Sequence, residues 1–508
     1  MPDTNDIFAG AGRANGAALA VAEVPSLPLA DFLAAVTGGV AAGLRVAAFF
    51  GQPLESGGLR LWAILASEAR GRWFPLRTDT AATSYPSLTP ACPELHWFER
   101  ELGENWGVEP VGHPWLKPIR FSPPRRGPRP GAAARPAIGD TSYFQVAGEE
   151  VHEVAVGPVH AGIIEPGHFR FQCHGEQVLH LEISLGYQHR GVERNLVGGP
   201  DHKSLHLAET LCGDSTVAHA TAYCQALEAL GHGRAPARAQ ALRGVALELE
   251  RIANHVGDLG ALAGDVGFLP TLSFCGRLRG DVLNLTGLIC GNRFGRRLLK
   301  PGGVGYDLDP ELTAEILARL APLTEDLTGA VELLWDAASV MARFEGAGRV
   351  SAADARALGL VGPPARAAGL ERDVRADFPA GIYQFAQIPV STGDTGDVSA
   401  RAKVRWLEIL RSLAFVREQL AGLPQGEVLR PPGPPAPESL AVSLVEGWRG
   451  EVCHVAVTGG DGRFAAYKVV DPSFHNWFGL ALALRDQEIS DFPLCNKSFN
   501  LSYCGHDL

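Results

Sequence analysis

The segment Leu242–Leu262, "LRGVALELERIANHVGDLGAL", decides the fold of this chain. Its apolar residues recur every three or four positions, at Leu242, Val245, Leu249, Ile252, Val256 and Leu259. That spacing draws one apolar stripe along a helix, which is typical of helices packed against other helices. Similar stripes run through residues 311–345 and 401–421. The sequence therefore predicts a helical bundle for most of the chain.

Two β hairpins are predicted beside this bundle. In residues 168–186, "HFRFQCHGEQVLHLEISLG", apolar side chains alternate on both sides of a turn at His174–Gly175. A second hairpin, in residues 450–472, turns on Gly459–Gly462. The predicted fold class is α+β: a large, mainly helical domain with peripheral β hairpins, preceded by a smaller domain.

The chain before the bundle divides into two predicted parts. Short strand-like runs alternate with helical ones in residues 1–121, which indicates a small α+β domain. Residues 122–150 are rich in Pro, Gly, Ala and Arg and are predicted to be a semi-extended linker. Residues 151–508 form the large domain in this interpretation.

Composition excludes several classes of protein. The 508 residues carry a net charge of −11, which gives no overall basic surface for nucleic acid. No apolar run approaches the ~20 residues that span a bilayer. Nine scattered cysteines and no basic segment at the N-terminus favour a reducing compartment, the cytoplasm. No dinucleotide, Walker A or nucleophile-elbow motif is present, so any NAD chemistry is expected in other subunits.

Several motifs, in the same order along the chain, resemble two related families. Residues 156–171, "VGPVHAGIIEPGHFRF", and 175–195, "GEQVLHLEISLGYQHRGVERN", resemble the D-type peripheral component of complex I. They resemble even more closely the large subunit of membrane-bound energy-converting [NiFe] hydrogenases, the formate-hydrogenlyase or hydrogenase-4 type. Residues 467–491 continue this likeness, and residues 98–121 resemble the C-type component of complex I. The resemblance covers nearly the whole chain and implies a fusion of the C-type and D-type components.

The resemblance also bears on metal binding. In these hydrogenases two C-x-x-C pairs hold nickel and iron, and here they fall on Cys212 with Ser215 and on Ser502 with Gly505. A serine hydroxyl is a poor substitute for a thiolate, so no NiFe centre and no metal is expected on this chain. The alternative is a shifted register with Cys495 and Cys504 as ligands, although their nine-residue offset is not chelate spacing.

Five further residues are candidates for proton or quinone chemistry. In "HRGVE" the resemblance implies that Glu193 lies on a proton route, with His189 and Arg190 beside it. The alternative is that Arg190 and Glu193 only pair with each other. A histidine near the first hairpin touches quinone in complex I, and His168 or His160 occupies that region here. The tyrosine that would accompany it is absent.

The remaining candidates are His219 and a partner contact. His219 lies seven residues after Cys212, which on one helix places both on the same face. Arg293, Gly302 and Gly303 resemble the contact of this family with its iron–sulfur subunit. Turn geometry is the alternative explanation for the two glycines.

The resemblance implies a peripheral subunit at the cytoplasmic face of a membrane complex, docked on a small iron–sulfur subunit and on membrane subunits. Its work would be electron transfer or redox coupling of the NAD(P)H–quinone oxidoreductase kind. Three hypotheses stay open. The chain is a redox subunit that serves quinone or another small acceptor, a genuine [NiFe] hydrogenase with atypical ligands, or a non-catalytic coupling subunit.

Overall fold

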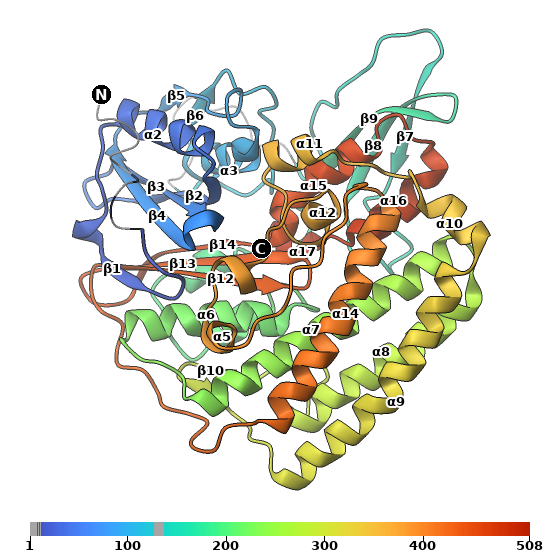
Figure 1. Ribbon diagram of the computed structural model, residues 1–508. Helices are drawn as coiled ribbons and strands as arrows, with labels where there is room; N and C mark the ends of the chain where they lie inside the picture. The colour runs from blue at the N-terminus through green and yellow to red at the C-terminus, as the bar shows by residue number, and fades with distance from the viewer. Residues whose placement is uncertain (1–7, 9, 11, 126–136) are drawn as a thin grey trace.

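The computed structural model of the protein describes residues 8, 10, 12–125 and 137–508. Part of the predicted linker, residues 126–136, lies outside the described residues. The structure mixes long helices with several small sheets, which confirms the α+β class (Figure 1). The division into a domain of residues 1–121, a linker of residues 122–150 and a domain of residues 151–508 stays a prediction.

The N-terminal part is built on a three-stranded antiparallel sheet. Its strands β2 (Arg45–Pro53), β3 (Leu59–Ser67) and β4 (Arg72–Thr80) follow one another in order. Helix α2 (Leu29–Ala41) packs on β3 and β4, and α3 (His96–Trp106) packs on β2. Strands β5 (Ser84–Pro86) and β6 (Glu109–Val111) form a parallel pair.

Long helices form the bundle at the lower right of Figure 1. Helix α7 (Ala237–Asp265) contains the segment Leu242–Leu262. It packs against α8 (Leu269–Cys290) and α14 (Val398–Ala421). Helix α9 (Pro310–Trp335) packs on α8 and α14. The six stripe residues of α7 are all buried, which confirms the predicted helix packing.

A four-stranded antiparallel sheet joins the bundle to the N-terminal part. Its order is β1 (Ala18–Ala20), β12 (Ser439–Gly447), β13 (Gly450–Thr458) and β14 (Phe464–Val470). The turn predicted at Gly459–Gly462 is confirmed, because it joins the end of β13 to the start of β14. Every residue of β12 and β13 is buried, so the hairpin that these two strands form lies inside the protein. Helix α6 (Thr216–Leu230) packs on both strands. Strand β1 comes from the start of the chain.

The first predicted hairpin is confirmed as two strands of a meander at the upper right of Figure 1. Strands β7 (Val151–Val156), β8 (His168–His174) and β9 (Gln177–Ser184) pair in sequence. The shorter elements are α4 (Val192–Leu196), α5 (Ser204–Glu209), β10 (Leu299–Lys300), β11 (Gly303–Val304), α10 (Ala338–Phe344), α11 (Ala352–Ala357), α12 (Gly362–Ala367), α13 (Val374–Asp377), α15 (Pro472–Ala483), α16 (Phe492–Phe499) and α17 (Tyr503–Asp507). Among the described residues, no helix has the length and apolar character needed to cross a membrane.

Candidate functional site

The predicted ligand positions come together where three segments meet. Cys212 lies in the turn before α6, Ser502 caps the start of α17, and Arg449 lies in the tight turn between β12 and β13. The cap is a hydrogen bond from the Gly505 N–H to Ser502 Oγ, 2.8 Å long. We call Cys212, Asp214, Ser215, Arg449, Ser502 and Cys504 the Arg449 centre.

The guanidinium group of Arg449 fills the space between the first two ligand positions. Its Nη1 lies 2.5 Å from Asp214 Oδ1, 3.3 Å from Cys212 Sγ and 3.4 Å from Ser215 Oγ. Nη2 donates to Asp214 Oδ2 at 2.9 Å, which makes a bidentate pair. Burial lowers the pKa of Arg449, but the neighbouring acidic groups, Asp214 foremost, together outweigh burial and raise that pKa well above its ordinary value. A permanent organic cation therefore occupies this position.

Two thiols approach each other across Ser502. Cys212 Sγ lies 3.1 Å from Ser502 Oγ, which lies 3.4 Å from Cys504 Sγ. The hydrogen bond with the Cys504 thiol and burial raise the pKa of Cys212 well above its ordinary value. Cys495 lies apart in α16, where burial raises its pKa to about 12. Cys504 joins the centre, whereas Cys495 packs against Gly348, so the alternative register with Cys495 and Cys504 as ligands is not seen.

The fourth ligand position has no room for a side chain. A Cβ atom on Gly505 would lie 2.5 Å from Asp471 Cγ and 2.6 Å from Asp471 Oδ2. Asp471 is fixed there because it caps α15, accepting the Ser473 N–H at 2.8 Å. A carboxylate therefore lies against the position where the resembled hydrogenases carry a cysteine.

These residues do not fit a NiFe centre. Two of the four predicted positions carry hydroxyl groups, one carries no side chain, and a guanidinium group separates Cys212 from Ser215. Soft metal ions need several thiolates, whereas a cation at this position repels a metal ion. Across the described residues, no three His, Cys, Asp or Glu side chains are grouped as metal ligands.

His219 does not share a helix face with Cys212, so that prediction is wrong. Helix α6 begins at Thr216, after Cys212, and the His219 ring faces other groups. Its Nε2 lies 3.1 Å from Asp471 Oδ2, and its Nδ1 lies 3.1 Å from Nε2 of His454. The ring nitrogens of His219 are thus both used inside the core.

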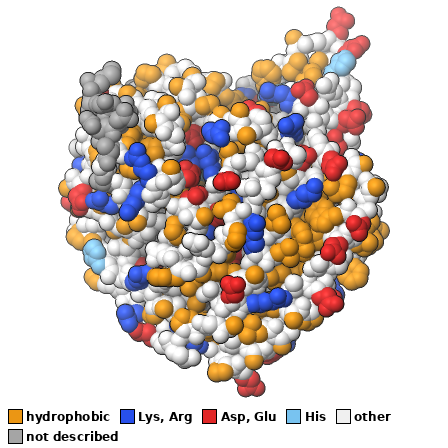
Figure 2. Space-filling model, viewed as in Figure 1, with side chains coloured by type: hydrophobic (Ala, Val, Ile, Leu, Met, Phe, Trp, Pro, Cys, Tyr) orange, Lys and Arg blue, Asp and Glu red, His pale blue; other side chains and the backbone are white. Residues whose placement is uncertain are grey.

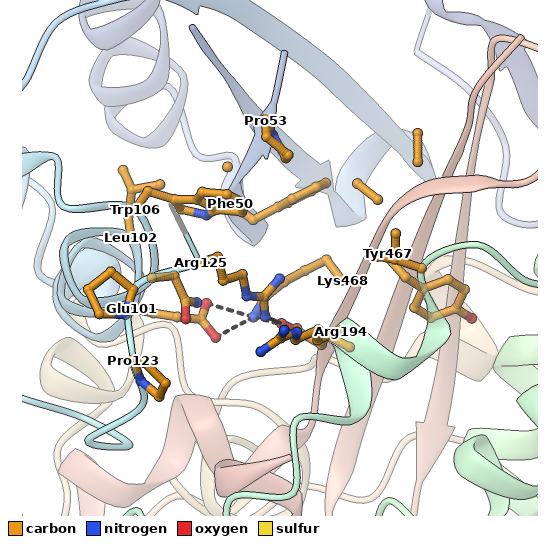
Figure 3. A pocket seen from close by; sticks show the side chains of 17 residues that line it. Phe50, Pro53, Glu101, Leu102, Trp106, Pro123, Arg125, Arg194, Tyr467 and Lys468 are labelled. Carbon is orange, nitrogen blue, oxygen red and sulfur yellow. Dashed lines mark hydrogen bonds and ion pairs between the residues drawn. The ribbon is translucent and has the colours of Figure 1, made fainter. Parts of the chain in front are cut away.

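A cleft of about 450 Å³ lies between the N-terminal part and β14 (Figure 3). At its floor Lys468 Nζ lies 2.6 Å from Glu101 Oε2 and 2.9 Å from Glu193 Oε1. Arg125 Nη2 lies 3.0 Å from Glu193 Oε2. Burial raises the pKa of Glu193, but Lys468, Arg125 and Arg120 outweigh burial and lower it to about 2. Glu193 is therefore ionised at neutral pH.

The other two residues of "HRGVE" make separate contacts. Arg190 donates to the carbonyl oxygens of Thr210 at 2.7 Å and Leu211 at 2.9 Å. Because Glu193 pairs with Lys468 and Arg125, the alternative in which Arg190 and Glu193 pair with each other is wrong. His189 Nδ1 lies 2.7 Å from the Asp507 carbonyl oxygen.

The two histidines near the first hairpin bind the backbone of one loop. His168 Nδ1 lies 3.3 Å from the Gly157 carbonyl oxygen, and His160 Nε2 lies 2.9 Å from that of Gly167. Burial lowers the pKa of His168. His160 lines a smaller cleft of about 190 Å³ together with Tyr503. Quinone contact at either histidine stays a prediction.

The predicted partner contact divides into two parts. A Cβ atom on Gly302 would lie 2.1 Å from the Arg430 carbonyl oxygen, and one on Gly303 would lie 2.0 Å from that of Val428. Both glycines are therefore covered by the chain itself, which supports turn geometry and close packing as their role. A contact of Arg293 with another subunit stays a prediction.

Sequence reasoning missed two members of the Arg449 centre, Asp214 and Arg449, and two residues near it, His454 and Asp471. Asp214 lies between the two aligned ligand positions, so its charge was a signal within the motif. Arg449 lies in a short turn, where an arginine is usually exposed. His454 lies in a mostly apolar strand, and no sequence pattern marks its partner.

Two protein-family models match the chain. Residues 31–127 match the respiratory-chain NADH dehydrogenase 30 kDa subunit, and residues 265–432 match the 49 kDa subunit. A carbon monoxide-induced hydrogenase of Rhodospirillum rubrum is 33% identical over 350 residues, which are 69% of this chain and 97% of that protein. The chain belongs to the family of complex I-like and hydrogenase subunits.

Two further relatives cover different shares of the chain. Formate hydrogenlyase subunit 5 of Escherichia coli is 29% identical over 85% of this chain and 78% of its own length. A D-type component of the NADH-quinone oxidoreductase of Clostridium beijerinckii is 30% identical over 60% of this chain and 83% of its own length. The similarity thus extends over 85% of this chain in one relative and 60% in the other.

Proposed function

We propose that this chain is a peripheral fusion of C-type and D-type components in a membrane-associated complex of the complex I and energy-converting hydrogenase kind. Its partners would be a small iron–sulfur subunit and membrane subunits, and its place the cytoplasmic face of the membrane. The observation that carries the proposal is the Arg449 centre within a family fold. The chain would take part in electron transfer or redox coupling without a NiFe centre of its own.

The surface supports an assembly. Hydrophobic side chains gather in Figure 2 on the side where Figure 1 draws α8, α9 and α10. Exposed apolar residues of this region include Leu269, Phe274 and Leu333. Contiguous apolar surface of this kind is typical of contacts with other proteins.

The proposal is tested by the metal content of the native complex. Nickel and iron per chain would be measured by mass spectrometry after anaerobic purification with the partner subunits. We expect no nickel, with iron accounted for by clusters of the partner subunit. About one nickel per chain, lost in the variant Cys212→Ser but kept in the matched control Cys275→Ser, would instead establish the hydrogenase with atypical ligands.

The redox and coupling roles differ in how they use the cleft. Glu193→Gln keeps the shape of the side chain and removes its charge. If the complex assembles but loses function, the charged cleft takes part in coupling. If the complex assembles and keeps its function, Glu193 has only a structural role.

A further inference from the structure

Two free thiols from distant parts of the chain meet in the Arg449 centre. Cys212 Sγ lies 3.1 Å from Ser502 Oγ, and Ser502 Oγ lies 3.4 Å from Cys504 Sγ. The two thiols also share a hydrogen bond with each other. A disulfide forms without backbone movement only where two cysteine side chains already face each other. The shared hydrogen bond places Cys212 and Cys504 in that relation.

The two thiols differ in their access to solvent. All nine cysteines of the chain lie in the described residues, and Cys504 alone among them is not buried. Cys212 is only 2% exposed. A reagent from solution therefore meets Cys504 first, and Cys212 lies behind it. An accessible cysteine beside a second cysteine that can react with it is typical of thiol redox sensors.

Charged groups beside Cys212 suit this thiol for the second step of an oxidation. Its Sγ lies 3.0 Å from Asp214 Oδ1, which accepts the thiol hydrogen. Arg449 Nη1 lies 3.3 Å from the same sulfur and donates toward it. The carboxylate can take the thiol proton as Cys212 attacks, and the guanidinium group stabilises the negative charge that develops on sulfur.

We propose that Cys212 and Cys504 are a reversible dithiol–disulfide site whose oxidant is a hydroperoxide. Cys504 Sγ attacks one oxygen of hydrogen peroxide and the O–O bond breaks, which leaves a sulfenic acid and, with the thiol proton, one water. Cys212 Sγ then attacks Cys504 Sγ and the S–O bond breaks. The departing hydroxide takes the Cys212 proton through Asp214 and leaves as a second water. Each sulfur gives up one electron, and the two peroxide oxygens gain them.

Reduction reverses the reaction and completes the site. Two molecules of a low-molecular-weight thiol restore both cysteines by exchange and become one disulfide themselves. In the oxidised chain the new bond joins the turn before α6 to α17, where the reduced chain has only hydrogen bonds through Ser502. The inference goes beyond the proposed function and does not depend on it, because it concerns thiols of this chain alone.

The site is tested on the full-length chain, which is first reduced and then treated with hydrogen peroxide in oxygen-free buffer. Thiol titration in denaturant counts the cysteines that remain, and mass spectrometry of the blocked peptides identifies the bond. We expect the loss of two of the nine titratable thiols and their return with dithiothreitol. The peptides of Cys212 and Cys504 should be found joined, lighter than the reduced pair by two hydrogen atoms.

Variants separate the two steps of the oxidation. Cys212→Ser lacks the second thiol, so Cys504 should stay a sulfenic acid that dimedone labels. Cys504→Ser lacks the accessible thiol, so we expect neither a dimedone label nor a loss of thiols. The matched control is Cys495→Ser, whose thiol is buried outside the Arg449 centre, and it should lose two thiols as the wild type does.

The wild-type chain alone decides the proposal, even where a substitution disturbs folding. A chain that keeps all nine thiols in peroxide would overturn it, and so would a disulfide mapped to another pair of cysteines. Hydrogen exchange of residues 502–508 is a second readout, which we expect to slow on oxidation and to recover with dithiothreitol. None of these results depends on nickel or on the partner subunits, so they leave the proposed function to its own test.

Discussion

Residue 505 carries no side chain because Asp471 fills the space beside its backbone. The substitution Gly505→Ala would press a methyl group against a carboxylate that His219 and Ser473 hold in place. We expect a loss of about 1–3 kcal/mol in the free energy of unfolding, as for other overpacked cores. Urea unfolding followed by circular dichroism measures this loss.

Gly213 is the matched control for that experiment, because no atom lies within 4 Å of a Cβ placed there. Gly213→Ala should change the free energy of unfolding by less than about 0.5 kcal/mol. Equal effects of the two substitutions would mean that Asp471 moves aside, and a cysteine at position 505 would then be tolerated as well.

Glu193 makes stability depend on pH. Its pKa in the folded chain, about 2, lies below the ordinary value of 4.5, so its contribution is complete above pH 4.5 and is lost as pH falls toward 2. The difference in pKa corresponds to roughly 3 kcal/mol. In Glu193→Gln the free energy of unfolding should therefore fall less between pH 5 and pH 3 than in the wild type. The exposed Glu149→Gln should follow the wild type.

At the scale of elements, buried ion pairs tie the helices to the central sheet. Arg366, in α12, lies 2.8 Å from Glu408 in α14 and 2.8 Å from Glu446 in β12. Removing one member of a buried pair leaves a charge without compensation and costs about 3–5 kcal/mol. We expect a loss of that size in the free energy of unfolding of Arg366→Leu, measured by denaturant titration.

An exposed pair provides the comparison. Arg277 is 53% exposed and pairs with Asp281 and Asp326 on the surface of α8 and α9. Arg277→Leu should cost less than about 1 kcal/mol, because solvent screens surface pairs. A similar loss in both variants would mean that the buried network contributes little beyond packing.

The elements themselves were largely predictable, whereas the site was not. The stripe of α7 and the alternation in β8 and β9 are local patterns, so sequence spacing was enough to predict them. Arg449 meets Cys212 across 237 residues, and no local pattern encodes that distance in sequence. For the same reason His219 was assigned the wrong neighbour: its contacts come from β13 and α15.

At the scale of the molecule, the two parts of the chain are joined by buried polar contacts. Arg45 of β2 pairs with Glu451 of β13, and Lys468 of β14 pairs with Glu101 of α3. The Asn15 side chain donates to the carbonyl oxygens of Phe378 and Leu444. We expect these contacts to hold the parts together without a covalent connection.

Separate expression tests this expectation. Residues 1–125 and 137–508, produced as two chains in one cell, should purify together in a 1:1 ratio by size-exclusion chromatography. Lys468→Met should weaken the pair, because it leaves Glu101 and Glu193 without their shared cation. Independent elution of two folded parts would show that the connection is needed.

The pairing of β1 with β12 also sets an order of events during synthesis. Ala20 lies opposite Ser439, so the first strand of the sheet has no partner until roughly 400 further residues have left the ribosome. At about 5–20 residues per second this takes on the order of half a minute or longer. Strands β2, β3 and β4 can pair with one another early, whereas β1 cannot pair until β12 has been synthesised. Strand β1 is therefore among the last parts of this protein to find its place.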